Sequence, residues 1–320
     1  MNHEFTQRLT LARHATDRRA ELRSRPELLD ELAADARTRV IVLNQGKALV
    51  RGHELTTVSL EELEAVEPAA RQEILFLGVS TEAAPTEPVG TPFLAVTVSD
   101  EVARLLGPEV SHWGDLRILG TEFSDRDAGL FTQALALANW HRTHPHSPVD
   151  GSATVPTQAG WVRHSAADEK AQNFPRTDPA IIVMVTDNKD RLLMGNNAMW
   201  ESNRFSLLAG FVEPGESLEA AVIREVREES GIEVVDPIYL GSQPWPFPQS
   251  LMLGFKAKVA TGFNPENTVA DGEEILKLRW FTREELSASL DEIVLPGHVS
   301  IARALIEEWF GGPLDQEAIW

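Results

Sequence analysis

The chain contains no cysteine among its 320 residues. Disulfide bonds and thiol catalysis are therefore excluded. No apolar run approaches the ~18 residues that a membrane-spanning helix needs, and the first stretch, MNHEFTQRLTLARHATDRRA, lacks the contiguous apolar segment of a secretory signal. We therefore expect a cytoplasmic protein with no membrane partner.

Basic residues are scarce as well. The chain has 29 Lys and Arg against 49 Asp and Glu, a formal net charge of −20. Broad nonspecific adhesion to nucleic acid is disfavoured, because it depends on basic side chains that neutralise phosphates. An acidic protein that acts on an anionic substrate needs metal ions as intermediaries. The length exceeds one typical domain, so two domains are expected.

The most informative segment is GFVEPGESLEAAVIREVREESGI, residues 210–232. Ser217 as N-cap and Gly231 as terminating glycine predict a helix over 217–230, preceded by a loop with Pro214 and Gly215. At ~100° per residue, Glu225, Glu228 and Glu229 share one arc of the helix. The neighbouring arc carries Val222, Ile223 and Val226 and is expected to face the core. An isolated E-x-x-E-E run is more often a solvated acidic face.

The flanking residues overturn that reading. They complete the pattern G-x5-E-x7-R-E-U-x-E-E-x-G-U, with U apolar, at Gly210, Glu216, Arg224, Glu225, Val226, Glu228, Glu229, Gly231 and Ile232. The segment thus resembles the box of the Nudix hydrolases, which cleave nucleoside diphosphates linked to another moiety. The resemblance implies Mg²⁺ or Mn²⁺ held by the Ala209 backbone carbonyl, Glu225, Glu229 and Glu274, with Glu228 close by and Glu273 as the alternative to Glu274.

The resemblance also implies roles. Glu225 and Glu228 are both candidates for activating the attacking water. Arg224 is expected to orient the glutamate carboxylates through charge-assisted hydrogen bonds rather than to touch substrate.

A second signature follows at residues 242–250, SQPWPFPQS. It resembles the sequence that marks the NADH pyrophosphatase branch of the Nudix enzymes. Its three prolines predict a rigid, non-helical loop that either presents side chains to a dinucleotide or packs over the core. The expected ligand-facing residues are Gln243, Pro244, Trp245, Pro246, Phe247, Pro248, Gln249 and Ser250. Further pocket residues implied by the resemblance are Phe174 and Phe211, which stack on a base or pack in the core, with Ala302 and Arg117.

Hydrophobic patterning predicts two domains of α+β class. Residues 1–141 form a β-rich domain with charged helical character over 1–35, strands at 38–44, 74–79 and 92–99, and a closing helix at 126–141. The resemblance implies a divergent Nudix-like domain without the box. For residues 174–320, patterning predicts strands at 179–186, 191–195, 251–259 and 276–281 and an amphipathic helix at 300–310. The resemblance implies that this part is the catalytic Nudix domain, an α/β/α sandwich.

Residues 142–173 connect the two domains. Similar proteins commonly carry a four-cysteine zinc ribbon here, whereas Ser147, Asp150 and Ser165 stand where cysteines would be expected. The histidines His141, His144 and His146 are more typical of a solvated connection than of a closed tetrahedral site. We predict no structural zinc.

The resemblance predicts metal-dependent hydrolysis of the pyrophosphate bond of NADH and NAD⁺, which gives AMP and nicotinamide mononucleotide. It also implies a homodimer that completes the base pocket across its interface. Two alternatives remain. Removal of an NAD cap from RNA uses the same bond, although the low basicity disfavours it. A non-catalytic ligand sensor is disfavoured by the intact REVREESG.

Overall fold

The structure is a computed structural model that describes residues 3–68, 73–85 and 87–316. The chain divides into two compact units. The C-terminal unit comprises the described residues of Met1–Ala12, Asp178–Pro244 and Ser250–Trp320, and the N-terminal unit comprises Arg13–Thr177 and Trp245–Gln249. None of the helices in the described residues has the length and apolarity to cross a lipid bilayer.

A six-stranded mixed sheet forms the centre of the C-terminal unit. The strand order is β15-β16-β12-β13-β17, and β14 pairs with β12. The parallel pair is β12 with β16, whereas β13, β14 and β17 make antiparallel pairs. The strands are β12 (Asp178–Thr186), β13 (Leu192–Asn197), β14 (Leu208–Phe211), β15 (Val234–Trp245), β16 (Ser250–Val259) and β17 (Ile275–Phe281). The helices are α1 (His3–Thr6), α7 (Leu218–Ser230), α8 (Arg283–Ala288) and α9 (Ile301–Phe310).

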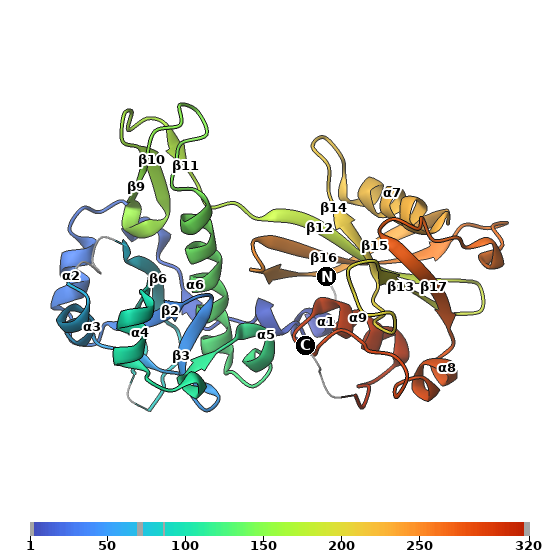
Figure 1. Cartoon of the computed structure of the whole chain (residues 1–320), viewed down its shortest axis with the longest axis horizontal. Helices are drawn as coiled ribbons and strands as arrows, with labels where there is room; N and C mark the ends of the chain where they lie inside the picture. Colours follow the sequence, from blue (N-terminus) through green and yellow to red (C-terminus); the bar gives the residue numbers. More distant parts are fainter. Residues whose placement is uncertain (1–2, 69–72, 86, 317–320) are drawn as a thin grey trace. The chain divides into compact units, whose positions relative to one another are not determined.

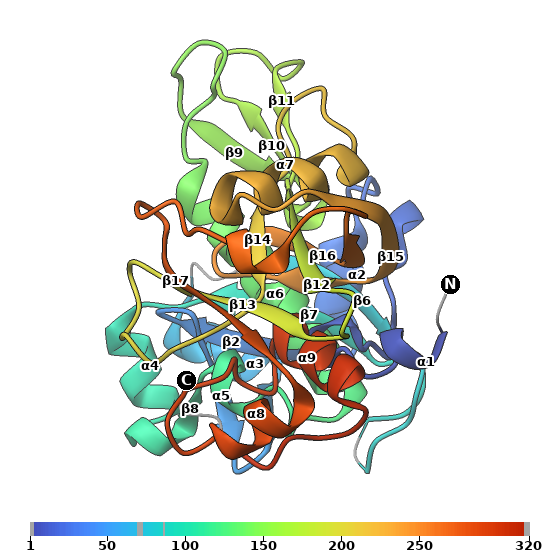
Figure 2. The same cartoon turned by 90° about the vertical axis from the view of Figure 1, so that its right-hand side faces the viewer.

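Alternating side chains of β12 build two separate cores. Ile181 and Val183 pack with Val222 of α7, while Ile182 and Met184 pack with Leu305 of α9. Successive residues of a strand point to opposite faces, so a continuous apolar run is what a sheet covered on both faces requires. Figures 1 and 2 show α7 and α9 on opposite sides of this sheet. The predicted α/β/α sandwich is confirmed.

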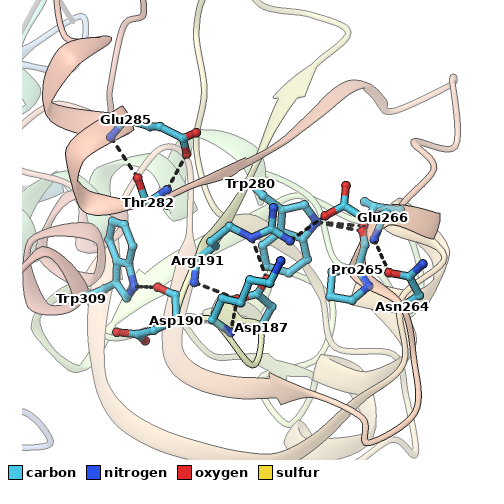
Figure 3. Close-up of polar contacts among 12 residues, drawn as sticks. Asp187, Asp190, Arg191, Asn264, Pro265, Glu266, Trp280, Thr282, Glu285 and Trp309 are labelled. Atoms are coloured by element: carbon cyan, nitrogen blue, oxygen red, sulfur yellow. Dashed lines mark hydrogen bonds and ion pairs between the residues drawn. The ribbon is translucent and has the colours of Figure 1, made fainter.

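The turn between β12 and β13 is held by charged hydrogen bonds (Figure 3). Asp187 accepts from the backbone amide of Arg191 at 2.8 Å and from its Nε at 2.7 Å. The same guanidinium reaches Glu266 at 2.9 Å. Trp309 of α9 donates its indole N–H to the Asp190 carbonyl at 3.0 Å. These contacts tie α9 and the segment before β17 to the hairpin.

The N-terminal unit repeats the same topology with shorter elements. Its eight-stranded sheet has the order β1-β6-β7-β2-β3-β4, with β5 beside β2 and β8 beside β3. β7 runs parallel to β2, β5 is antiparallel to β2, and β8 is antiparallel to β3. These pairings match those of β16, β14 and β17 around β12 and β13. The strands are β1 (Thr16–Asp17), β2 (Arg39–Asn44), β3 (Lys47–Arg51), β4 (Glu54–Leu55), β5 (Thr57–Val58), β6 (Leu75–Ser80), β7 (Pro92–Thr97) and β8 (Trp113–Gly114).

Helices cover both faces of this second sheet as well. Residues of α2 (Leu28–Ala34), α3 (Leu60–Val66) and α4 (Asp100–Leu106) share a core with Val40 and Val42 of β2. The long helix α6 (Asp125–Thr143) contacts β2, β6 and β7, and α5 (Leu116–Leu119) packs against α6. Residues 154–173 add a separate three-stranded sheet of β9 (Thr154–Thr157), β10 (Val162–Ser165) and β11 (Gln172–Asn173).

Helix α3 follows β5 as α7 follows β14, but it cannot serve the same chemistry. It spans 7 residues with the sequence LEELEAV and contains no arginine. Its Glu62 is engaged in a capping box with Ser59. A site that needs the glutamates and the arginine of α7 can therefore form only in the C-terminal unit, because α3 lacks the arginine.

The predicted core strands and the helices at 126–141, 217–230 and 300–310 are confirmed, with each end within two residues of its predicted place. The helical character predicted for residues 1–35 is only partly right, because this stretch forms short helical pieces and the strand β1. The sequence-based division places residues 1–12 in the N-terminal domain. Contacts group them with the C-terminal unit, because Phe5 and Leu9 are buried among residues of α9.

Candidate active site

Helix α7 carries the glutamates, and its ends are formed as its sequence predicts. Ser217 Oγ accepts a hydrogen bond from the Ala220 amide at 3.1 Å, and Gly231 ends the helix in the left-handed region at φ 69°. Val222 and Val226 are buried, but the prediction for Ile223 was wrong, since it is 41% exposed. The buried arc is centred on Val222, Val226 and Glu229, so Ile223 falls outside it.

Gly210 brings the β14 backbone against the helix. A Cβ at this position would lie 2.0 Å from Glu225 Cδ and about as close to both carboxylate oxygens. No side chain fits in that space. The first glycine of the box is therefore needed so that the Glu225 carboxylate can lie directly against β14.

Arg224 organises the carboxylates around it. Its Nε and Nη2 bind both oxygens of Glu216 at 2.8 Å each, in the bidentate geometry favoured by guanidinium–carboxylate pairs. Its Nη1 donates to Glu225 at 2.8 Å and to Glu228 at 2.9 Å, and Nη2 also reaches the Phe211 carbonyl at 3.0 Å. The guanidinium is thus occupied by protein groups. Glu216, to which the sequence assigned no role, anchors the loop to the helix.

Glu229 is the most perturbed acid of the site. Its side chain is 3% exposed, and Oε2 is buried with no hydrogen-bond partner. Burial, followed by the charges of Glu274, Glu225 and Asp271, raises the pKa of Glu229 to about 9. A hydrogen bond from the Ala209 amide only partly offsets this rise. Burial also raises the pKa of Glu225.

The segment before β17 supplies the remaining acid. Glu274, and not Glu273, acts on the pKa values of both Glu225 and Glu229. Asp271, which sequence reasoning missed, accepts the amides of Glu273, Glu274 and Ile275 at 2.7, 2.9 and 3.0 Å. An Asp that accepts amides two to four residues ahead is a recognisable turn signal. Asp271 therefore fixes the backbone that carries Glu274.

These carboxylates fit a divalent cation by their chemistry. Carboxylate oxygens are the ligands that Mg²⁺ and Mn²⁺ prefer, and the unpartnered buried oxygen of Glu229 among three further acids is costly without a cation. In the described part of the chain, however, no three acidic or histidine side chains are gathered in a geometry that would hold a metal ion. In the geometry observed, Arg224 takes up the carboxylates of Glu225 and Glu228.

Comparison with known families agrees with this geometry. The NUDIX domain model matches residues 176–304, which include β12, β14, α7 and the first turn of α9. The model of the NADH pyrophosphatase-like rudimentary NUDIX domain matches residues 37–140. The chain therefore contains a Nudix domain and a rudimentary Nudix domain. The repeated topology of the N-terminal unit is thus that of a rudimentary Nudix domain, as predicted.

Individual relatives give the same family. The chain is 47% identical over 205 residues to "NAD-capped RNA hydrolase NudC" of Mycobacterium bovis, which covers 61% of this chain and 64% of the relative. It is 45% identical to the protein of that name from Stutzerimonas stutzeri, over 46% of this chain and 52% of the relative. It is 34% identical to "NAD-capped RNA hydrolase NUDT12" of Macaca fascicularis, over 59% of this chain and 43% of the relative. The matches thus span less than two thirds of these relatives' length.

The two phenylalanines of the expected Nudix base pocket are surface residues. Phe211 at the end of β14 is 59% exposed, and Phe174 in the N-terminal unit is 60% exposed. Neither ring packs in a core, so both remain available for stacking. Ala302, by contrast, is 3% exposed and packs into the core from the first turn of α9.

The SQPWPFPQS segment is less of a loop than its prolines suggested. Strand β15 continues to Trp245, so only residues 246–249 form the turn. Gln243 is fully buried, with Nε2 donating to the Val299 carbonyl at 3.0 Å and Oε1 accepting from the Leu11 amide at 3.3 Å. Its carboxamide therefore ties backbone segments together instead of facing a ligand as predicted. Pro244 and Ser250 lie in the flanking strands, in the C-terminal unit.

Hydrogen bonds link the residues that replace cysteines in the connector. Ser165 Oγ donates to Asp150 at 3.2 Å and accepts the amides of Ala167 and Asp168 at 3.0 and 3.2 Å. Ser147 Oγ accepts the Val149 amide at 3.2 Å. Hydrogen bonds from Ser152 lower the pKa of Asp150 to about 2. The connector turns are thus held by hydroxyl and carboxylate groups.

We expect purified, tag-free protein to contain far less than one zinc per chain. Hydroxyl groups are poor Zn²⁺ ligands, and both ring nitrogens of His141 already contact protein groups, the Gly160 carbonyl and Arg163. Elemental analysis after dialysis against a chelator measures this directly. Stoichiometric zinc that resists the chelator would show that the histidines form a replacement site.

Proposed function

We propose that this protein hydrolyses the pyrophosphate bond of NADH and NAD⁺ to AMP and nicotinamide mononucleotide, with Mg²⁺ or Mn²⁺ as cofactor. The observation that carries the substrate class is the strand register at one end of β12. Phe211 lies opposite Ala180 on one side of β12, and Ser250, the last residue of SQPWPFPQS, lies opposite Asp178 on the other. The dinucleotide signature therefore ends beside the box, within one sheet.

In this proposal the glutamates have two roles, metal binding and activation of the attacking water. Glu225, Glu229 and Glu274 would hold the metal ions, with the Ala209 carbonyl as a further ligand and Glu228 close by. When bound, a divalent cation neutralises charge on the pyrophosphate oxygens and so favours attack at phosphorus. Nudix hydrolases generally need such a metal.

Glu225 and Glu228 both remain candidates for the base. One of them takes a proton as the water oxygen bonds to phosphorus and the bond from that phosphorus to the bridging oxygen breaks. Arg224 holds both carboxylates within 2.9 Å of its Nη1. Burial raises the pKa of Glu225, which favours proton uptake by its carboxylate.

A second candidate substrate is RNA with a 5′-NAD cap. The names of the relatives favour it, since each is called an NAD-capped RNA hydrolase. The reaction breaks the same bond, and the net charge of −20 weakens any contribution from the RNA body. We also propose a cytoplasmic homodimer without a structural zinc ion.

A substrate panel tests the assignment. NADH, NAD⁺, ADP-ribose, diadenosine polyphosphates and NAD-capped RNA are each assayed with Mg²⁺ and with Mn²⁺, and the products are identified by mass. We expect AMP and the mononucleotide from NADH and NAD⁺. A protein that binds NADH but cleaves no member of the panel with either metal would be a ligand sensor, and the proposal would be wrong.

Removing the ring of Phe211 or Phe174 tests base stacking. Stacking of a base on an aromatic ring contributes ~1–3 kcal/mol, so we expect Phe211→Ala or Phe174→Ala to lower kcat/KM for NADH about 5- to 150-fold. ADP-ribose lacks nicotinamide, so a ring that stacks on nicotinamide should leave its hydrolysis nearly unchanged. Equal losses for both substrates, at unchanged Tm, would assign the ring to adenine instead.

A further inference from the structure

The turn at residues 246–249 is held by the rudimentary Nudix domain. Asn139, near the end of α6, donates from Nδ2 to the Pro246 carbonyl at 2.9 Å and to the Pro248 carbonyl at 3.1 Å. Both hydrogens of one carboxamide are thus aimed at two carbonyls of the same turn. All three residues of these contacts lie in the N-terminal unit, which includes Trp245–Gln249.

The prolines of the turn limit the hydrogen bonds that its own backbone can donate. They have no amide hydrogen to donate, whereas the Phe247 amide donates to the Trp245 carbonyl at 2.7 Å. A second outside contact comes from Arg117 of α5, whose guanidinium lies 4.2 Å from the centre of the Phe247 ring. Phe247 in turn meets Trp245 edge to face, with ring centres 4.9 Å apart.

We propose that Asn139 is a positioning residue, which fixes the 246–249 turn so that Trp245 and Phe247 offer a preformed surface to the dinucleotide. The inference rests on the proposed function for its substrate. The turn is covalently joined to β15 and β16, and Asn139 holds its tip. A preordered turn loses less conformational freedom when substrate binds.

The choice of residue suits this role. An ionised aspartate has the same shape as asparagine but offers only acceptors, so Asn139→Asp would set a carboxylate against two carbonyl oxygens. Asn139→Ala removes the bonds without repulsion. Gln133 on the same helix provides a matched control, because its Nε2 donates to the Leu77 carbonyl at 2.8 Å and touches no part of the turn.

The test compares N139D, N139A and Q133E in the full chain. KM and kcat for NADH are measured with Mg²⁺, alongside Tm and hydrogen exchange at the Phe247 amide. We expect N139D to raise KM about tenfold or more at nearly unchanged kcat, since two hydrogen bonds are lost. Exchange at Phe247 should accelerate while Tm holds, and N139A should show smaller changes of the same kind. Q133E should lower Tm and leave KM unchanged.

Two outcomes would overturn the proposal. One is an N139D protein with wild-type KM and wild-type exchange at Phe247. The other is a loss of Tm in N139D that matches Q133E and accompanies every change in KM, which would make Asn139 merely structural. If the wild-type protein cleaves no NADH, the proposed function is wrong. Hydrogen exchange at the Phe247 amide in N139D then still tests whether Asn139 orders the turn.

Discussion

Glu229→Gln should lower turnover of NADH by orders of magnitude while leaving the fold intact. Glutamine keeps the shape of glutamate and removes an anionic oxygen, which is the atom that a divalent cation would require. The side chain is 3% exposed and its Oε2 has no hydrogen-bond partner. No fold-stabilising contact of that oxygen is therefore lost.

The stability of the metal-free protein provides an independent readout. The pKa of Glu229 is raised from its usual 4.5 to about 9. A raised pKa contributes stability that is fully present below the unfolded pKa and is lost as pH rises through the folded one. Wild-type protein without metal should therefore lose stability between about pH 5 and pH 9. Glutamine mimics the neutral acid, so E229Q should be at least as stable at pH 8 and vary less with pH.

Turnover and Tm, each measured with and without Mg²⁺, test whether Glu229 binds the metal. Wild-type Tm should rise with Mg²⁺ because a ligand that binds only the folded state stabilises it, and E229Q should show a much smaller rise. Glu219→Gln is the control, since Glu219 is an exposed residue of the first turn of the same helix. Near-normal turnover of E229Q at saturating Mg²⁺ would remove Glu229 from the metal site.

Local chemistry made much of the C-terminal unit predictable. The N-cap serine, the terminating glycine and the apolar run of β12 each act over a few residues, so α7 and the central strand could be placed in advance. The prolines of SQPWPFPQS misled because β15 is the outermost strand of its sheet. Proline is tolerated at a sheet edge, where one side of the strand needs no amide donor.

Contacts across the fold could not be predicted. The box shows that Glu216 and Arg224 are needed, but only the path of the loop places both Glu216 oxygens 2.8 Å from that guanidinium. The burial of Gln243 depends on the Leu11 amide, which lies 232 residues earlier. The shared topology of the two units was equally hidden, because a covered sheet needs only apolar residues on its strands.

Gly210→Ala should abolish most activity at little cost in stability. The new methyl group would lie 2.0 Å from Glu225 Cδ, 2.1 Å from Oε1 and 2.3 Å from Oε2. These atoms end a flexible side chain, so the overlap is relieved by moving the carboxylate and not the backbone. Glu225 then leaves both Arg224 and the cluster around Glu229. We expect kcat to fall by orders of magnitude and the rise of Tm with Mg²⁺ to shrink.

Gly231→Ala is the matched control for this substitution. Gly231 has a φ of 69°, and a Cβ there would meet nothing closer than the Val269 carbonyl at 4.0 Å. An alanine in this left-handed position costs ~1 kcal/mol of stability, so Tm should fall while kcat is kept. Kinetics and thermal unfolding of the two variants should therefore give opposite patterns. A Gly210→Ala protein with wild-type kcat would mean that the position of the Glu225 carboxylate against β14 does not matter for the reaction, and Glu225 would lose its place among the metal ligands and candidate bases.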